Sequence, residues 1–128
     1  MKKQLDHVAH FHDVYQIGNE STPIAELDKA TYMLRYNLMQ EENDEYLEAC
    51  NNGDLVEIAD ALGDMMYILA GTILKHGLQN KIEEVFDEIQ RSNMSKLDTN
   101  GEPIFREDGK ILKGPNYFKP NIHAILEK

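Results

Sequence analysis

Apolar residues recur every three or four positions along most of the chain, which is the period of an amphipathic helix. The pattern predicts four helices and a short fifth one, at about residues 3–15, 21–50, 54–75, 79–92 and 121–126. The two longest stretches are separated only by the short segment Asn51–Asp54. We therefore expect them to form antiparallel neighbouring helices.

Residues that typically cap helices mark the expected boundaries. Ser21-Thr22-Pro23 predicts the start of the second helix, because a hydroxyl can cap it and proline suits its first turn. Asp54 is the expected N-cap of the third helix. His76-Gly77 is the expected end of that helix, where glycine can adopt the left-handed conformation.

After Ser92 the helical pattern gives way to turn sequences. Asp98–Gly101 and Glu107–Lys110 are both typical of turns, and the apolar pairs that flank the second turn can form a short hairpin. The sequence therefore predicts an all-α fold, a four- to five-helix bundle with a long C-terminal loop, formed by residues 1–128 as a single domain.

Composition excludes several classes of protein. A chain of 128 residues suits one hydrophobic core, and its formal net charge of −10 disfavours binding to duplex nucleic acid. No apolar run is long enough to span a membrane, and the N-terminus lacks the apolar core of a signal peptide. The single cysteine, Cys50, excludes an internal disulfide. We expect a cytoplasmic protein.

Acidic residues of the two long helices fall at regular spacings. Glu41, Glu42 and Glu45 form an E-E-x-x-E motif, and Glu57 and Asp60 form an E-x-x-D motif on the next helix. Residues three or four apart share a helix face. Glu45 and Glu57 lie about equally far from the intervening turn, so antiparallel pairing should bring the two motifs to the same height.

Such a group of carboxylates needs a counter-ion, because like charges at close range repel one another. The stretch from Tyr36 to Leu74 contains nine acids and no Lys or Arg. Ligation by oxygen atoms alone suits Mg²⁺, or Mn²⁺ in its place. Asp64 continues the same face by one turn, outside the two motifs. The alternative is that these are ordinary surface acids on a solvated face.

The carboxylate motifs also carry a family resemblance. E-E-N-D-E at 41–45, eleven intervening residues and E-I-A-D at 57–60 resemble the signature of the MazG-like superfamily of all-α nucleoside triphosphate pyrophosphohydrolases. That superfamily includes the phosphoribosyl-ATP pyrophosphohydrolase-like proteins. The S-N-M-S-K and G-K-I-L-K-G-P-N-Y segments of the tail resemble the ending of one bacterial and phage branch. The resemblance spans about residues 7–122.

The resemblance implies Mg²⁺-dependent hydrolysis of a nucleoside triphosphate to the monophosphate and pyrophosphate. By motif position, the implied metal ligands are Glu42, Glu45, Glu57 and Asp60. Glu41 matches a residue that contacts a second metal or orients the attacking water. A carboxylate beside the metal is also a reasonable general base. Asp64 lies outside the core signature, which leaves its role open.

Cations that could attract a triphosphate lie outside the acidic stretch. We expect Lys96 and Lys113, which fall within the two tail motifs, to contact phosphates, together with Arg91 and Asn93. The tail could fold over its own site or over that of a partner subunit. The alternative is that the lysines are solvated loop residues.

Four side chains are candidates for contact with a nucleobase. Phe11, His12 and Tyr15 lie on one stretch of the first helix, and Asn37 lies on the second. The alternative for the aromatic residues is that they pack in the core, and for His12 that it is structural.

Wide apolar faces on modest helices indicate a further packing surface. Met33, Met39, Met65 and Met66 are expected at a subunit interface, and the family resemblance implies a homodimer or a dimer of dimers. Two rival functions remain. One is a related enzyme acting on dUTP, dCTP or phosphoribosyl-ATP. The other is a catalytically silent helical module that binds nucleotides.

Overall fold

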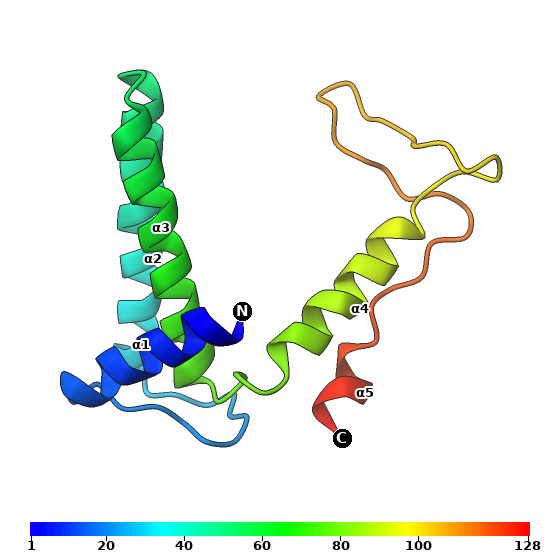
Figure 1. The fold of residues 1–128 in the computed structure, drawn as a ribbon. Coiled ribbons are helices and arrows are strands. Elements are labelled where there is room, and N and C mark those ends of the chain that lie inside the picture. Colours follow the sequence, from blue (N-terminus) through cyan, green and yellow to red (C-terminus); the bar gives the residue numbers. More distant parts are fainter. The chain divides into compact units, whose positions relative to one another are not determined.

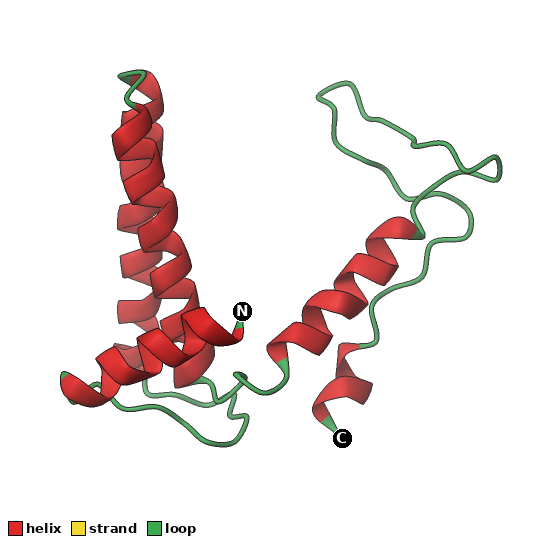
Figure 2. Cartoon of the chain, in the orientation of Figure 1, coloured by secondary structure: helices red, strands yellow, loops and turns green.

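The computed structural model describes all 128 residues and contains five helices and no strand (Figures 1 and 2). The predicted all-α fold class is therefore confirmed. The chain forms two compact units, Met1–Asn80 and Lys81–Lys128. None of the helices combines the length and the apolar character that crossing a membrane requires.

The first unit is built on a long antiparallel helix pair. Helix α2 (Lys29–Asn51) and helix α3 (Leu55–Lys75) are joined by a tight turn, and α1 (Lys2–Val14) packs on α3 toward the opposite end of the pair (Figure 1). The Asp54 carboxylate caps α3 as predicted, accepting a hydrogen bond from the Glu57 backbone amide at 3.2 Å. The predicted helix pair is confirmed.

Small buried residues allow these helices to approach one another closely. Ala49 on α2 and Ala61 and Ala70 on α3 are almost fully buried. Apolar side chains from α1 complete the core at the far end, where Leu5 and Val8 are buried. The core is thus narrow, and the outer faces of α2 and α3 remain accessible.

The predicted start of α2 at Ser21-Thr22-Pro23 is wrong. The helix begins at Lys29, with Asp28 in the N-cap position. The preceding segment is instead held against the end of α3, where the Ile24 amide donates to the His76 carbonyl at 2.9 Å. The His76 ring Nδ1 donates to the Ile24 carbonyl at 2.8 Å. These tertiary hydrogen bonds override the local capping signal.

The second unit contains α4 (Ile82–Met94), a long loop and α5 (Ile122–Leu126). Helix α4 begins three residues later than the pattern predicts. The predicted hairpin is reduced to one antiparallel bridge between Phe105 and Ile111. The short last helix is present as predicted, with Asn121 as its N-cap.

The two tail motifs meet at the base of the loop. The Gly114 amide donates to the Lys96 carbonyl at 2.8 Å. The Ser92 hydroxyl, almost fully buried, donates to the Phe118 carbonyl at 2.8 Å, and the Phe118 amide donates to the Ser95 hydroxyl at 3.1 Å. These bonds close the long loop and bring the backbone of Lys96 next to the residue that follows Lys113.

Candidate active site

Three carboxylates converge between α2 and α3. One oxygen from each of Glu42, Glu45 and Asp64 lies within 4.8 Å of the others. Glu42 and Glu45 are one turn apart on α2, whereas Asp64 comes from the facing helix. The structure thus places Asp64, whose role the motifs leave open, beside two of the predicted metal ligands.

The electrostatics of this cluster depend on Glu42. Burial, followed by hydrogen bonding to Glu45 and repulsion from Glu45, Asp64 and Asp60, raises the pKa of Glu42 to about 7. Burial and the neighbouring charges of Asp60 and Glu45 also raise the pKa of Asp64. The cluster therefore favours binding a positive charge.

A second observation concerns one oxygen of Glu42. Its Oε2 atom is buried and has no hydrogen-bond partner. A buried carboxylate oxygen without a partner is costly, and a cation is the ligand that best compensates it. Together with the all-oxygen donor set, this atom makes the cluster of Glu42, Glu45 and Asp64 a good fit for a hard divalent ion.

The remaining predicted ligands lie nearer the α2–α3 turn. Glu57 and Asp60 line a hollow of about 400 Å³ with Glu45 and Glu48. Glu45 belongs both to this hollow and to the three-carboxylate cluster. The charge of Asp60 reaches Glu42 and Asp64. The acids therefore form two adjoining groups that share Glu45.

Glu41, the predicted general base, lies apart from both groups. Its side chain is exposed, and it belongs neither to the three-carboxylate cluster nor to the lining of the hollow. Its position on α2, one residue before Glu42, turns it about 100° around the helix from that ligand.

Sequence reasoning missed a cation just before the acidic stretch. The Arg35 guanidinium donates from Nε to the Thr72 hydroxyl at 3.0 Å and from Nη2 to the Ile68 carbonyl at 2.9 Å. Burial lowers the pKa of Arg35. A Cβ at Gly71 would meet this guanidinium, so the glycine provides its space. Arg35 thus ties α2 to α3 two turns from Glu42 and helps to hold the acids in register.

The base-pocket prediction needs correction at His12. Its ring is only 2% exposed, and its Nδ1 donates to the Asn19 side-chain oxygen at 2.7 Å. Burial, as the main cause, lowers the pKa of His12. His12 is therefore a core residue that joins α1 to the following loop, because packing against α3 encloses it.

The other predicted base-contacting residues are accessible. The rings of Phe11 and Tyr15 lie 4.5 Å apart, and Phe11 meets the Tyr67 ring edge-on at 5.4 Å. Asn37 is exposed on α2. The aromatic pair thus joins a third ring that the sequence pattern did not single out.

The predicted phosphate-binding residues all lie in the second unit. Arg91 pairs with Glu88, at 2.7 Å between Nε and Oε1, and its guanidinium lies 4.4 Å from the centre of the Phe118 ring. The Lys113 ammonium lies 4.8 Å from the centre of the Tyr117 ring. Lys96 is partly buried at the base of the loop, and Asn93 is exposed on α4.

The fold and site define a class of protein, in which an all-α chain gathers carboxylates between two antiparallel helices. A family model described as phosphoribosyl-ATP pyrophosphohydrolase matches residues 8–93, and the chain belongs to this family. The matched segment contains the carboxylates of both motifs and Asp64.

One relative comes from a virus. An uncharacterized protein of Acanthamoeba polyphaga mimivirus is 31% identical over 86 residues, which cover 65% of this chain and 34% of the viral protein. The chain thus spans about a third of the length of that relative.

Proposed function

We propose that this protein is a divalent-metal-dependent pyrophosphohydrolase that converts a nucleoside triphosphate to its monophosphate and pyrophosphate. The observation that carries the proposal is the convergence of Glu42, Glu45 and Asp64, together with the buried, unpartnered Oε2 atom of Glu42. Family membership supports the same chemistry.

We propose different roles for the acids according to their positions. Glu42, Glu45 and Asp64 would hold one Mg²⁺ or Mn²⁺ ion, with Glu57 and Asp60 extending the site toward the turn. A bound divalent ion supplies charge neutralisation for phosphates and lowers the pKa of a coordinated water. Glu41 lies apart from both groups of acids, and it is from its motif position alone that we propose it to orient the attacking water or accept its proton.

The phosphates require cations from elsewhere in the chain. Lys96 and Lys113 are the proposed phosphate ligands, since the Gly114–Lys96 hydrogen bond brings their backbones together at the base of the loop. Asn93 would assist as a hydrogen-bond donor. Arg91 is already engaged by Glu88 and Phe118, which favours a structural role for it over phosphate binding.

We also propose that the protein acts as a homodimer or a dimer of dimers. Apolar residues on the first unit support this proposal, because Leu55 and Val56 at the start of α3 are each about three-quarters exposed, at 76% and 75%. Light scattering on the purified protein measures the assembly directly.

A nucleotide panel tests the proposed activity. Purified protein is incubated with ribo- and deoxyribonucleoside triphosphates and with phosphoribosyl-ATP, and pyrophosphate is measured with Mg²⁺, with Mn²⁺ or with a chelator. We expect turnover of at least one compound, dependent on the metal. Phosphoribosyl-ATP is the second candidate substrate because of the matched family. No turnover of any compound would instead indicate a silent nucleotide-binding module.

The raised pKa of Glu42 predicts how metal binding depends on pH. Its carboxyl holds a proton up to about pH 7, and the ion must displace that proton. The apparent affinity for Mg²⁺ should therefore rise by up to about tenfold per pH unit below pH 7 and level off above it. Calorimetric titrations from pH 6 to pH 8 measure this. An affinity unchanged across that range would contradict the prediction.

The same shift predicts how stability changes without metal. A carboxyl whose pKa is higher in the folded state than in the unfolded state stabilises the fold most at low pH. This contribution is lost as the pH rises from about 4.5 through about 7. The metal-free protein should thus melt at a lower temperature at pH 8 than at pH 6, and Mg²⁺ should reduce the difference.

A further inference from the structure

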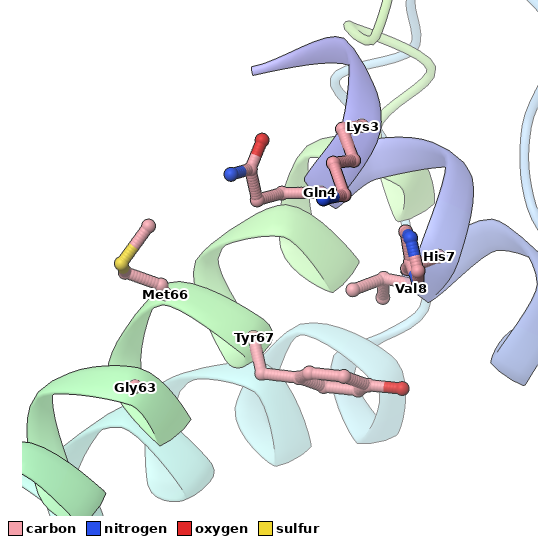
Figure 3. A pocket seen from close by; sticks show the side chains of 7 residues that line it. All are labelled: Lys3, Gln4, His7, Val8, Gly63, Met66 and Tyr67. Carbon is pink, nitrogen blue, oxygen red and sulfur yellow. The ribbon is translucent and has the colours of Figure 1, made fainter.

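A small cavity lies between α1 and α3, on the same unit as the acids. Its volume is about 290 Å³, close to the lower end of the range for small-ligand sites. Apolar surface comes from Val8 on α1 and from Met66 and Tyr67 on α3 (Figure 3). These dimensions suit one flat ring system.

Gly63, in the middle of α3, keeps this cavity open. A glycine destabilises the interior of a helix relative to alanine. A helix tolerates glycine where a neighbouring element packs too close for a side chain, or where the backbone angle φ is positive. Neither holds at Gly63, because an added Cβ would meet no atom within 4 Å and φ is not in the left-handed region. The remaining effect of the glycine is the space that a larger side chain would occupy.

Polar groups without partners surround the opening. Lys3, Gln4 and His7 line the cavity from α1, and the structure gives none of them a hydrogen bond or an ion pair (Figure 3). The amide of Gln4 offers a donor and an acceptor together, which suits the edge of a nucleobase. The Tyr67 ring, 41% exposed, provides an aromatic surface for stacking.

One residue that lines the cavity, Tyr67, lies on the same side of α3 as the acids. Gly63 precedes Asp64 by one residue and is turned about 100° around α3 from it, whereas Tyr67 follows Asp60 by seven residues, two helical turns, and lies on the same face. Tyr67 follows Asp64 by three residues, on a neighbouring part of the same face. A ligand with phosphates at the acids could therefore extend along α3 into the cavity.

We propose that this cavity binds the base of the nucleotide substrate, with Gly63 providing the space and Gln4 and Lys3 contacting the edge of the base. The inference rests on the proposed function, since it assumes that phosphates bind at the acids. It moves the base site from the predicted Phe11, His12, Tyr15 and Asn37 to the adjoining α1–α3 cavity.

The test fills the cavity. Gly63→Leu should raise KM for the preferred nucleotide by about tenfold or more, equivalent to about 1.4 kcal/mol, while kcat changes much less. Gly63→Ala adds a single carbon, whose position has no other atom within 4 Å, and it should raise KM less than Gly63→Leu does. Inorganic tripolyphosphate, which has no base, should inhibit all three proteins equally.

Two substitutions at the opening of the cavity keep the inference testable if Gly63→Leu does not fold. Gln4→Leu and Lys3→Met alter exposed side chains and should reduce the preference among bases in the nucleotide panel. An unchanged KM in a folded Gly63→Leu protein, or unchanged base preference in both variants at the opening, overturns the inference while leaving the proposed activity intact. Absence of turnover in the unmodified protein overturns both.

Discussion

Replacing Glu45 by glutamine should lower the rate of metal-dependent pyrophosphate release by more than about a hundredfold, because even groups that only orient metal ligands contribute 10- to 100-fold. Glu45 is the one carboxylate that belongs both to the cluster with Glu42 and Asp64 and to the hollow lined by Glu57 and Asp60. Initial rates at saturating Mg²⁺ and nucleotide measure the effect, and calorimetry measures the loss of metal affinity.

Asp44→Asn is the matched control for that variant. It removes the same charge from the adjacent residue of α2, but the Asp44 carboxylate is exposed and contacts only Gln40, at 3.2 Å. We expect nearly unchanged activity. Equal losses in Glu45→Gln and Asp44→Asn would mean that net charge, rather than ligation by Glu45, controls the rate.

Gly77→Ala should lower the free energy of unfolding by about 2–4 kcal/mol, a larger loss than we expect for the other variants proposed for this protein. Gly77 ends α3 with a φ of +66°, a conformation that costs an alanine about 1–2 kcal/mol. An added Cβ would also overlap the Thr22 carbonyl, which belongs to the segment held against the end of α3. Urea denaturation followed by circular dichroism measures the change.

Gly53→Ala separates the two causes. Gly53 has nearly the same backbone angle, +61°, at the turn between α2 and α3, but a Cβ there meets nothing within 4 Å. It should lose only the part that comes from the backbone angle. If the two alanine variants were equally unstable, the contact between Gly77 and Thr22 would contribute nothing.

The fold was predictable where local signals agree with the packing. The cap at Asp54 and the glycine at Gly77 correctly marked the ends of α3, because both act through bonds within a few residues. The Ser21-Thr22-Pro23 signal failed because the residues on either side of it, Glu20 and Ile24, donate their backbone amides to carbonyls at the end of α3. Long-range pairing of this kind leaves no periodic trace in the sequence.

For the candidate site, the sequence predicted which carboxylates share a helix face, but not which carboxylates of the two helices meet. The spacing of Glu42 and Glu45 on one helix follows from the helical repeat alone. Whether Asp60 or Asp64 lies closest to Glu42 and Glu45 depends on how far α2 and α3 are shifted against each other along their axes. The structure shows that Arg35, bound to Ile68 and Thr72, is one of the contacts that hold this register.

The sequence by itself determined the helical class, the antiparallel pair and the concentration of carboxylates on it, since these depend on residue period and on a short turn. The tertiary structure alone decided which carboxylates meet, that one oxygen of Glu42 is buried without a partner, and that His12 belongs to the core. Burial and close approach depend on side chains far apart in sequence, which become neighbours only when the helices pack.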